Sequence, residues 1–316
     1  MVSSHVSDVG RGVLQLIYTV FTPVYNRAHT LRRVYRSLSE QTFRDFEWLI
    51  VDDGSTDETS STVRRFIEEN GRNSFPIRYL FKENGGKHTA TNLGVAEARG
   101  DLFLTLDSDD ECVPEALERL YYHWTTIPSN IRDGYSAVTA LCKYPDGSIV
   151  GNRFPESPFD SDSIRSHEWF HISGEKWGFQ RTDVMRQFPF PEFPGERFVP
   201  ESLVWNRIAL SYKTRYVNEA LRIYHPEADS LSSSVVAIRV MSPRGSSLMY
   251  NELSAAKIPV YSKLKAVMNY LRFSIHAGTP LRQIVKNSAH SVLAVTMYPA
   301  AFLFYLKDRR STNGSR

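Results

Sequence analysis

The sequence predicts an α/β fold built on a mostly parallel sheet with helices on both faces. Two observations predict it: short apolar runs alternate with helical patterns through residues 16–125, and each run ends abruptly in polar residues. A β-α-β-α-β-α-β order implies right-handed crossovers, which cover both faces of a parallel sheet. The chain has 316 residues, of which 41% are hydrophobic, so it can bury a core of this size.

Four strands are expected in this first part, with a helix after each. The strands are Leu16–Thr22, Phe46–Val51, Ile77–Phe81 and Leu102–Leu106. The helices are residues 31–38, where apolar residues recur at i, i+3, i+4 and i+7, then Thr56–Glu69, Thr89–Ala98 and Pro114–Trp124. Gly100 is expected to end the third helix as its C-terminal cap, and Pro114 to open the fourth.

The second half of the chain is less regular. Val138–Lys143 and Ser148–Val150 flank a Pro-Asp-Gly turn, which predicts an antiparallel hairpin. Proline-rich loops are expected over residues 155–200. Further elements are a helix at Glu201–Leu210, strands at Arg215–Val217 and Leu221–Tyr224, and helices with connecting loops over residues 246–310.

Three carboxylates, Asp107, Asp109 and Asp110, directly follow the fourth predicted strand. A buried parallel strand delivers its last residues to the carboxyl edge of the sheet, where open α/β folds bind ligands. Carboxylates at i and i+2 can hold Mg²⁺ or Mn²⁺, hard cations that often bridge to substrate phosphates. The alternative is a polar loop that caps the next helix.

The other strand ends are polar as well. They read Thr22–Arg27, Asp52–Asp57 and Glu83–Lys87. Each segment alone could be a turn or a helix cap, but capping does not explain four polar ends at one edge. Carboxylates, glycines and a lysine gathered there predict a site for a phosphorylated, metal-bound ligand.

The segments Val20–Arg27, Val51–Asp57, Asn84–Gly94 and Ala98–Pro114 resemble the family 2 glycosyltransferases with the GT-A (Rossmann-like) fold. The resemblance covers about residues 15–125 closely and residues 172–232 more loosely. It implies transfer of a sugar from a nucleoside diphosphate donor, with a UDP-sugar favoured, to an acceptor hydroxyl with inversion. It also implies a Mn²⁺ or Mg²⁺ ion held through a DxD motif.

The resemblance assigns the donor nucleoside to the first two strand ends. Thr22, Pro23 and Tyr25 would flank the nucleobase and ribose. Asp53 would accept a hydrogen bond from the base, with Asp52 close by.

The resemblance assigns the phosphates and the metal to the other two strand ends. Gly85, Gly86 and Lys87 match a loop that approaches the base and the phosphates, where glycine permits close backbone approach and lysine supplies a point charge. Asp107 would face the ribose or the metal, and Asp109 would bind the metal directly. A metal ion would neutralise the charge on the departing diphosphate.

An inverting transfer needs a base that takes the proton of the acceptor hydroxyl. The resemblance places an acidic residue before a helix late in the domain, and Glu201 is the first choice, with Glu196 the second. Members of the family often carry Glu-Asp at this point, whereas this chain has Glu201-Ser202. Trp205 could stack on an acceptor sugar, and His225 could complete the metal shell.

Other functions fit less well. Gly85-Gly86-Lys87 is not a P-loop, because Phe81 stands where the first glycine is required and His88 follows the lysine. No GxGxxG follows the first strand, and no GxSxG elbow is present. The remaining alternatives are a nucleotidyltransferase and a non-catalytic nucleotide-sugar-binding module.

The predicted domains are a GT-A catalytic domain over residues 1–232 and a helical region over residues 233–316. The catalytic domain divides into a nucleotide-binding half, 14–125, and an acceptor half, 126–232. The acceptor is expected to be a saccharide or a lipid-linked sugar, in polysaccharide or glycolipid synthesis.

The charge balance and the two ends of the chain predict its surroundings. A net charge of +3 does not indicate nucleic acid as a partner, and two cysteines suggest a reducing compartment. Residues 1–12 lack the features of a signal peptide, so the protein is expected in the cytoplasm. Residues 289–306 are mostly apolar, and Lys307, Arg309 and Arg310 follow. Segment 289–310 is therefore predicted to contact the inner face of the membrane, the alternative being a packing helix.

Overall fold

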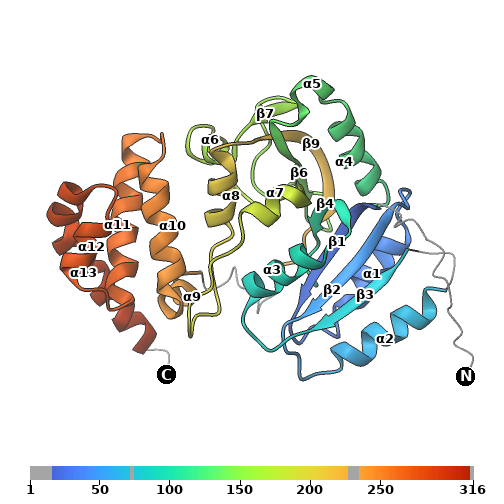
Figure 1. Cartoon of the computed structure of the whole chain (residues 1–316), viewed down its shortest axis with the longest axis horizontal. Helices are drawn as coiled ribbons and strands as arrows, with labels where there is room; N and C mark the ends of the chain where they lie inside the picture. Colours follow the sequence, from blue (N-terminus) through green and yellow to red (C-terminus); the bar gives the residue numbers. More distant parts are fainter. Residues whose placement is uncertain (1–15, 72–74, 227–234, 314–316) are drawn as a thin grey trace, which may run out of the picture.

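The computed structural model describes residues 16–71, 75–226 and 235–313, and these form a mixed sheet flanked by helices, with further helices at the C-terminal end (Figure 1). The strands are β1 (Leu16–Val24), β2 (Phe46–Asp52), β3 (Ile77–Phe81), β4 (Gly100–Thr105), β5 (Glu111–Cys112), β6 (Tyr135–Lys143), β7 (Phe159–Ser161), β8 (Lys176–Arg181) and β9 (Lys213–Ile223). They lie in the order β3-β2-β1-β4-β8-β6-β9-β5, with β7 paired to β9.

The helices that alternate with the strands are α1 (Leu31–Ser39), α2 (Thr59–Glu69), α3 (Lys87–Glu97), α4 (Ala116–Thr125), α5 (Ser129–Arg132), α6 (Ser163–Glu168), α7 (Thr182–Gln187) and α8 (Ser202–Ala209). The C-terminal helices are α9 (Val235–Met241), α10 (Pro243–Ala255), α11 (Val260–His276), α12 (Leu281–Asn287) and α13 (Ser291–Asn313).

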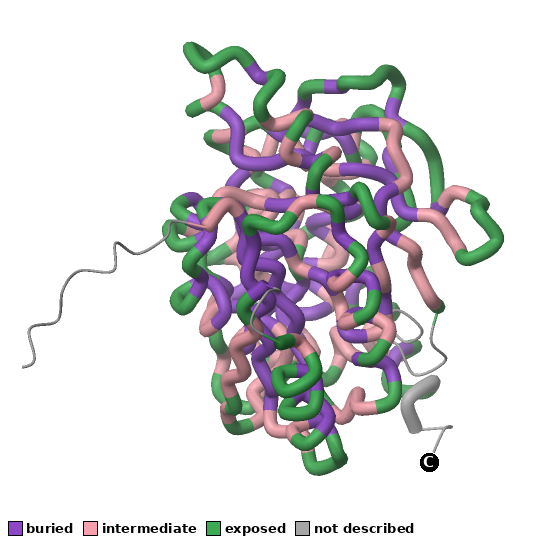
Figure 2. The backbone as a smooth tube through the Cα atoms, turned by 90° about the vertical axis from the view of Figure 1, so that its right-hand side faces the viewer, coloured by how far each residue is buried: buried purple, intermediate pink, exposed green. Residues whose placement is uncertain are grey.

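The first four strands form the parallel sheet that the sequence predicts. β1 pairs in parallel with β2 and β4, and β2 pairs in parallel with β3. Alternate residues of β1 point to opposite faces: Tyr18 and Val20 join a core with α1, α2 and α4, whereas Phe21 joins a core with α3, α7 and α8. Burial on both faces explains the apolar runs (Figure 2).

The second half of the sheet is mixed and corrects several expectations. β8 pairs antiparallel with both β4 and β6, while β6 and β9 are parallel. The predicted strands at 215–217 and 221–224 are one continuous strand, β9. The predicted hairpin after β6 is reduced to a single bridge between Lys143 and Ile149. The expected loops of residues 155–200 contain β7, α6, β8 and α7.

Gly100 does not cap a helix, because α3 ends at Glu97 and Gly100 is the first residue of β4. A Cβ atom at Gly100 would lie 2.2 Å from the carbonyl carbon of Tyr18. The glycine is therefore required by the close approach of β4 to β1.

The C-terminal helices pack on the sheet-containing part of the chain through α8 and α10. Arg207 of α8 donates two hydrogen bonds, of 2.9 and 2.7 Å, to Glu252 of α10. Val267, Leu271 and Ala301 belong to a separate core that joins α11, α12 and α13. The C-terminal helices thus have a core of their own and are attached to the rest of the chain (Figure 1).

Segment 289–306 lies mainly in α13, which packs on α11 with one face. Asp308 at the end of this face accepts hydrogen bonds from Arg272 and His276. In the part of the chain that the structure describes, no helix combines the length and apolar character that a bilayer span requires.

Candidate active site

Asp53 organises the loop that follows β3. One of its carboxylate oxygens accepts hydrogen bonds from Lys82 Nζ (2.6 Å) and Gly85 N (2.9 Å), and the other from Gly86 N (2.7 Å). The side chain is buried, so in this arrangement it holds the glycine loop against the end of β2. Sequence reasoning missed Lys82, because nothing in its spacing indicates this partner.

Gly86 joins this loop to the segment before α8. Its φ is +96°, a conformation that favours glycine. A Cβ atom there would lie 2.0 Å from the carbonyl oxygen of Arg197. No residue with a side chain fits at Gly86 without moving one of the two segments.

Thr22, Pro23 and Asp52, three residues of the predicted nucleoside set, are buried. Thr22 Oγ1 accepts a hydrogen bond from Trp48 Nε1 (2.9 Å), and Asp52 accepts from the Tyr79 hydroxyl (2.6 Å). Burial and the bond to Asp52 raise the pKa of Tyr79 to about 12. Tyr25 is 48% exposed and is the member of the predicted nucleoside set that is open to a ligand.

Asn26 connects the ends of β1 and β2 and was also missed by sequence reasoning. It has a φ of +53°, and its side-chain oxygen accepts hydrogen bonds from the backbone of Thr56 (2.8 Å) and Asp57 (3.3 Å). Asparagine is among the residues that best tolerate this backbone conformation, which is the one signal that could have found it.

Lys87 joins the end of β4 to the start of α8. Its Nζ lies 2.7 Å from Asp107 Oδ1 and 2.9 Å from Glu201 Oε1. Burial alone would lower the pKa of Lys87, but the two carboxylates raise it above its ordinary value. Burial alone would raise the pKa of Asp107, but the ion pair with Lys87 and the charge of Arg222 outweigh burial and lower it. The lysine is therefore charged and held between the predicted donor and acceptor residues.

Arg222 at the end of β9 is a further cation of the site that sequence reasoning missed. Its side chain is 5% exposed and lies 3.8 Å from Asp107, 3.4 Å from Asp110 and 3.2 Å from Glu175. Burial, with repulsion by neighbouring carboxylates added, raises the pKa of Asp110 to about 7. The charge of Arg222 lowers this pKa and offsets only part of the rise. Arg222 compensates much of the negative charge at the strand end.

The carboxylates of Asp107 and Asp109 fit a divalent metal ion. Among the described residues no other residue donates a hydrogen bond to the Asp109 carboxylate or forms an ion pair with it, and burial together with the Asp107 charge raises its pKa. The described chain contains no group of three histidine, cysteine or acidic side chains that could hold a metal. Mg²⁺ sites that bridge to phosphates commonly use only one or two carboxylates, so a pair of carboxylates is compatible with such a site.

His225 lies beside the acidic cluster. Its Nε2 is 3.0 Å from Glu111 Oε1, and its backbone N–H donates to Asp110 Oδ1 (3.0 Å). The ring is therefore paired with Glu111 in this arrangement.

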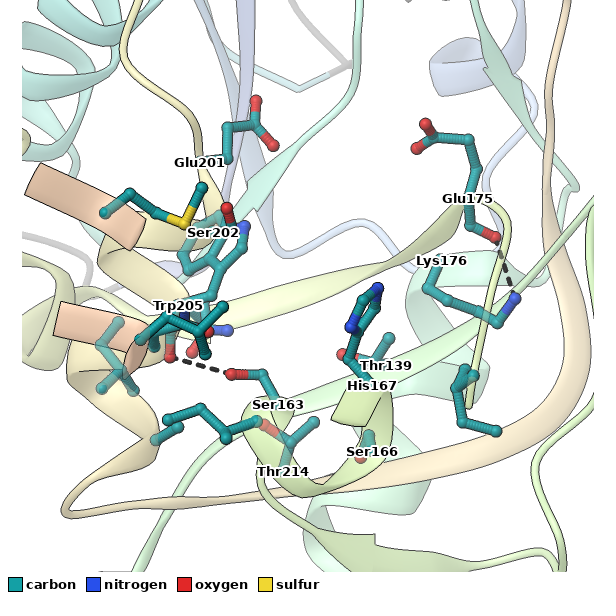
Figure 3. A pocket seen from close by; sticks show the side chains of 18 of the residues that line it. Thr139, Ser163, Ser166, His167, Glu175, Lys176, Glu201, Ser202, Trp205 and Thr214 are labelled. Carbon is teal, nitrogen blue, oxygen red and sulfur yellow. Dashed lines mark hydrogen bonds between the residues drawn. The ribbon is translucent and has the colours of Figure 1, made fainter. Parts of the chain in front are cut away.

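Glu201 lies at the edge of a cavity of about 750 Å³, and Trp205, one helical turn further on, lines the same cavity (Figure 3). The Glu201 side chain is 49% exposed. Glu196 is placed differently: its side chain is 8% exposed and accepts hydrogen bonds from the backbone of Arg244 (2.9 Å) and Gly245 (3.3 Å) at the start of α10. Of the two candidate bases, Glu201 faces the cavity and Glu196 supports a helix.

The cavity has walls from both parts of the molecule. The catalytic domain contributes α6, α8 and β8, and the C-terminal region contributes α10 and α11. His167, Glu175, Lys176 and Trp205 surround its open centre in Figure 3. The contribution of α6, α10 and α11 was not visible in the sequence, because it depends on the packing of distant elements.

The comparisons with known proteins agree with this architecture. Glycosyl transferase family 2 matches residues 19–184, more than half of the chain. A GalNAc(5)-diNAcBac-PP-undecaprenol beta-1,3-glucosyltransferase of Campylobacter jejuni is 27% identical over 78% of this chain and 78% of that protein. Glycosyltransferase GlyG of Streptococcus pneumoniae is 33% identical over 68% of this chain and 72% of that protein. GlyA of the same species is 36% identical, but the chain spans 31% of it.

Solved structures share the fold. S. aureus TarS in complex with UDP-GlcNAc superposes with a TM-score of 0.59 at 18% identity, covering 94% of this chain and 92% of that one. The mannosyltransferase PcManGT of Pyrobaculum calidifontis, in complex with GDP-Man and Mn²⁺, gives a TM-score of 0.54 at 18% identity over 97% and 86% of the two chains. The chain therefore belongs to glycosyl transferase family 2 and has the GT-A fold.

Proposed function

We propose that this glycosyltransferase moves a sugar from a UDP-sugar to the hydroxyl of a saccharide acceptor with inversion, and that Glu201 is the base. The observation that carries the proposal is the contact of Lys87 with both Asp107 and Glu201. It joins the edge of the sheet that suits a nucleotide diphosphate to the cavity that suits an acceptor. A non-catalytic nucleotide-binding module would not require a general base such as Glu201 at that junction.

The donor lies across the ends of β1, β2 and β4 in this proposal. Tyr25 is the exposed aromatic group beside the nucleoside, and the backbone of the Gly85-Gly86 loop approaches the phosphates. A uridine nucleotide is favoured because a structural neighbour at 0.59 TM-score was solved with UDP-GlcNAc. A guanosine nucleotide is the alternative, since a second neighbour was solved with GDP-Man.

Asp107 and Asp109 would hold Mn²⁺ or Mg²⁺ together with the donor phosphates. When bound, the ion supplies charge neutralisation for the departing diphosphate. His225 stays a lesser candidate for the same shell, because its ring pairs with Glu111. Lys87 adds a positive charge at the same edge and can turn from Asp107 to a phosphate oxygen.

Glu201 takes the proton of the acceptor hydroxyl. Its carboxylate is half-exposed to the cavity, where an acceptor can reach it. Its Oε1 lies 2.9 Å from Lys87 Nζ. A donor phosphate that draws Lys87 away leaves the Glu201 carboxylate free to act as the base, so donor binding prepares the acceptor side.

The acceptor is a saccharide, lipid-linked or part of a polymer, at the cytoplasmic face of the membrane. The name of the Campylobacter relative specifies a lipid-linked oligosaccharide, which supports this class. The face of α13 that points away from α11 supports membrane contact, because Val292, Val295 and Leu303 are 78%, 56% and 67% exposed there. Exposed Lys307 and Arg309 continue that helix and suit an anionic lipid surface.

The test is donor turnover by the full chain. UDP-glucose, UDP-galactose, UDP-GlcNAc, UDP-GalNAc and GDP-mannose are each supplied with Mn²⁺, and release of the nucleoside diphosphate is measured with and without saccharide acceptors. Release that an acceptor accelerates supports the proposal. A nucleotidyltransferase would instead release pyrophosphate from a nucleoside triphosphate and a sugar phosphate. A binding module would show a raised melting temperature with a donor and no turnover.

A further inference from the structure

Helix α6 carries a pair of side chains that the proposed chemistry leaves unused. His167 Nδ1 lies 3.0 Å from Glu168 Oε1, and both residues line the cavity that contains Glu201. The His167 side chain is 74% exposed, and its ring projects toward the middle of the cavity (Figure 3). Among the described residues its second nitrogen, Nε2, has no hydrogen-bond partner.

Glu168 is held from the other side by the C-terminal helices. Ser262 on α11 is close enough to its carboxylate to favour the charged form, and Lys265 on the same helix adds a positive charge. The bond to His167 and these neighbours outweigh burial and lower the pKa of Glu168, so it is an anion at neutral pH. An anionic partner at Nδ1 fixes both the tautomer and the orientation of the imidazole.

Two further hydrogen bonds fix α6 itself. Ser163 Oγ at its start donates to the carbonyl oxygen of Trp205 on α8 (3.0 Å). Trp169, directly after the helix, donates from Nε1 to the carbonyl oxygen of Lys257 in the turn before α11 (3.1 Å). The helix is thereby attached to the segment that carries the proposed base and to the C-terminal region.

We propose that His167 binds a hydroxyl group of the acceptor saccharide through Nε2, and that Glu168 and Ser262 are positioning residues that hold the imidazole toward the cavity. The inference rests on the proposed function and deepens it, since it assigns acceptor recognition to α6 and to α11.

The chemistry suits a sugar hydroxyl because that group both donates and accepts. When the Nδ1–H of a neutral imidazole donates a hydrogen bond to Glu168, Nε2 carries a lone pair. That lone pair can accept a hydrogen bond from a sugar hydroxyl. When the ring is protonated, Nε2–H donates to the hydroxyl oxygen. Trp205 on the neighbouring wall offers the flat apolar surface on which a sugar ring packs.

The test compares variants of the full chain in transfer from the best UDP-sugar to octyl β-glycosides of glucose, galactose, GlcNAc and GalNAc. His167→Ala should raise the acceptor KM by about fivefold to tenfold, the effect of one lost hydrogen bond, with kcat and donor hydrolysis unchanged. His167→Gln should restore part of the loss. Ser262→Ala should raise the acceptor KM by a smaller factor.

Arg165→Gln is the matched control, because Arg165 lies on the same helix, is exposed and does not line the cavity. An unchanged acceptor KM in His167→Ala would overturn the inference. So would a kcat that collapses in both His167 variants, since His167 would then be a catalytic residue. A loss of donor hydrolysis in His167→Ala would also overturn it, by showing that His167 supports the fold.

A binding measurement separates this inference from the proposed function. With histidine labelled at ¹³Cε1, the His167 resonance, assigned from His167→Gln, should shift when an octyl glycoside is added in the presence of UDP and Mg²⁺. A shift without any donor turnover would support a saccharide site and reject the proposed reaction. A resonance that no glycoside moves, in an enzyme that does turn over its donor, would reject the role of His167 alone.

Discussion

The proposed donor edge, formed by the ends of β1, β2 and β4, and the proposed acceptor cavity, lined by Glu201 and Trp205, are built by different means. At the donor edge, neighbouring strand ends supply the side chains, and short loops hold them: Asp53 alone receives two backbone N–H groups and Lys82. The acceptor cavity is assembled from α6, α8 and β8 with α10 and α11, elements that are distant in the sequence. The difference indicates that the donor edge is formed by local contacts, whereas the shape of the cavity depends on how two regions pack.

The largest effect is expected where the two regions meet. Glu201→Gln should lower the transfer rate by about 10³-fold, because the amide cannot take the acceptor proton. The donor KM should stay close to that of the wild type, since Glu201 acts on the acceptor side. Steady-state kinetics with a fixed acceptor check this. Glu196→Gln is the control, and a larger loss of kcat there would move the base to Glu196.

Removal of the metal carboxylate should have the next largest effect. Asp109→Ala should lower donor turnover by about 10²-fold, the scale for loss of a group that stabilises developing charge. EDTA should abolish turnover by the wild type, and Mn²⁺ or Mg²⁺ should restore it. Full activity in EDTA would contradict this and would leave Lys87 and Arg222 as the cations that face the diphosphate.

Asp308 provides a test of the C-terminal region that leaves the donor edge untouched. Asp308→Asn should lower the free energy of unfolding by about 2 kcal/mol at neutral pH, because the hydrogen bonds from the Arg272 guanidinium and from His276 are weakened. Burial alone would raise the pKa of Asp308, but Arg272 and His276 outweigh burial and lower it. The stabilisation is therefore present above the ordinary aspartate pKa and is lost as the pH falls through the lowered value.

Thermal unfolding of the wild type and Asp308→Asn across acidic pH checks this prediction. The difference between their melting temperatures should shrink as the pH falls below about 4. A difference that is independent of pH would show that packing, and not charge, holds α13 to α11.

The smallest effect is expected at the face of α13 that is proposed to contact the membrane. Lys307→Gln should weaken binding to phosphatidylglycerol vesicles by about fivefold, corresponding to about 1 kcal/mol per charge. Arg64→Gln on α2, which lies at the opposite end of the molecule in Figure 1, is the matched control. Vesicle sedimentation at low salt measures both. Equal binding by the two variants would leave α13 as a packing helix only.

Truncation before α13 is a poorer test of the same point. Ala294 and Ala301 of α13 are fully buried in the core shared with α11 and α12. Removing the helix would expose that core, so loss of membrane binding could not be separated from loss of structure. Single surface substitutions avoid this difficulty.

The comparison of the two regions also explains how much could be predicted from the sequence. Parallel strands end at one edge, so the polar residues after β1, β2 and β4 could be placed together from their positions alone. Side-chain partners such as Lys82 and Arg222 could not, because no periodicity marks them. β9 was divided in two because the polar pair Asn218-Glu219 interrupts its apolar pattern.

The elements around the cavity were not predicted from the sequence for another reason. β8 is paired on both sides with distant strands, and its alternation of buried and partly exposed residues spans only the six residues from Lys176 to Arg181. Tertiary contacts therefore determine this strand more than local preference does. The roles proposed for Glu201 and Trp205 came from family resemblance, and the orientation of His167 is proposed to depend, through Glu168, on Ser262, almost a hundred residues further along the chain.

The contact between Gly86 and Arg197 limits how this enzyme can be recombined with its relatives. The donor loop touches the segment that leads to α8 so closely that a single methyl group would separate them. A chimera that takes residues 14–125 from one glycosyltransferase and the remainder from another would have to match both surfaces at this contact. Exchanges that keep the two segments from the same parent are therefore the better route to new acceptor specificities.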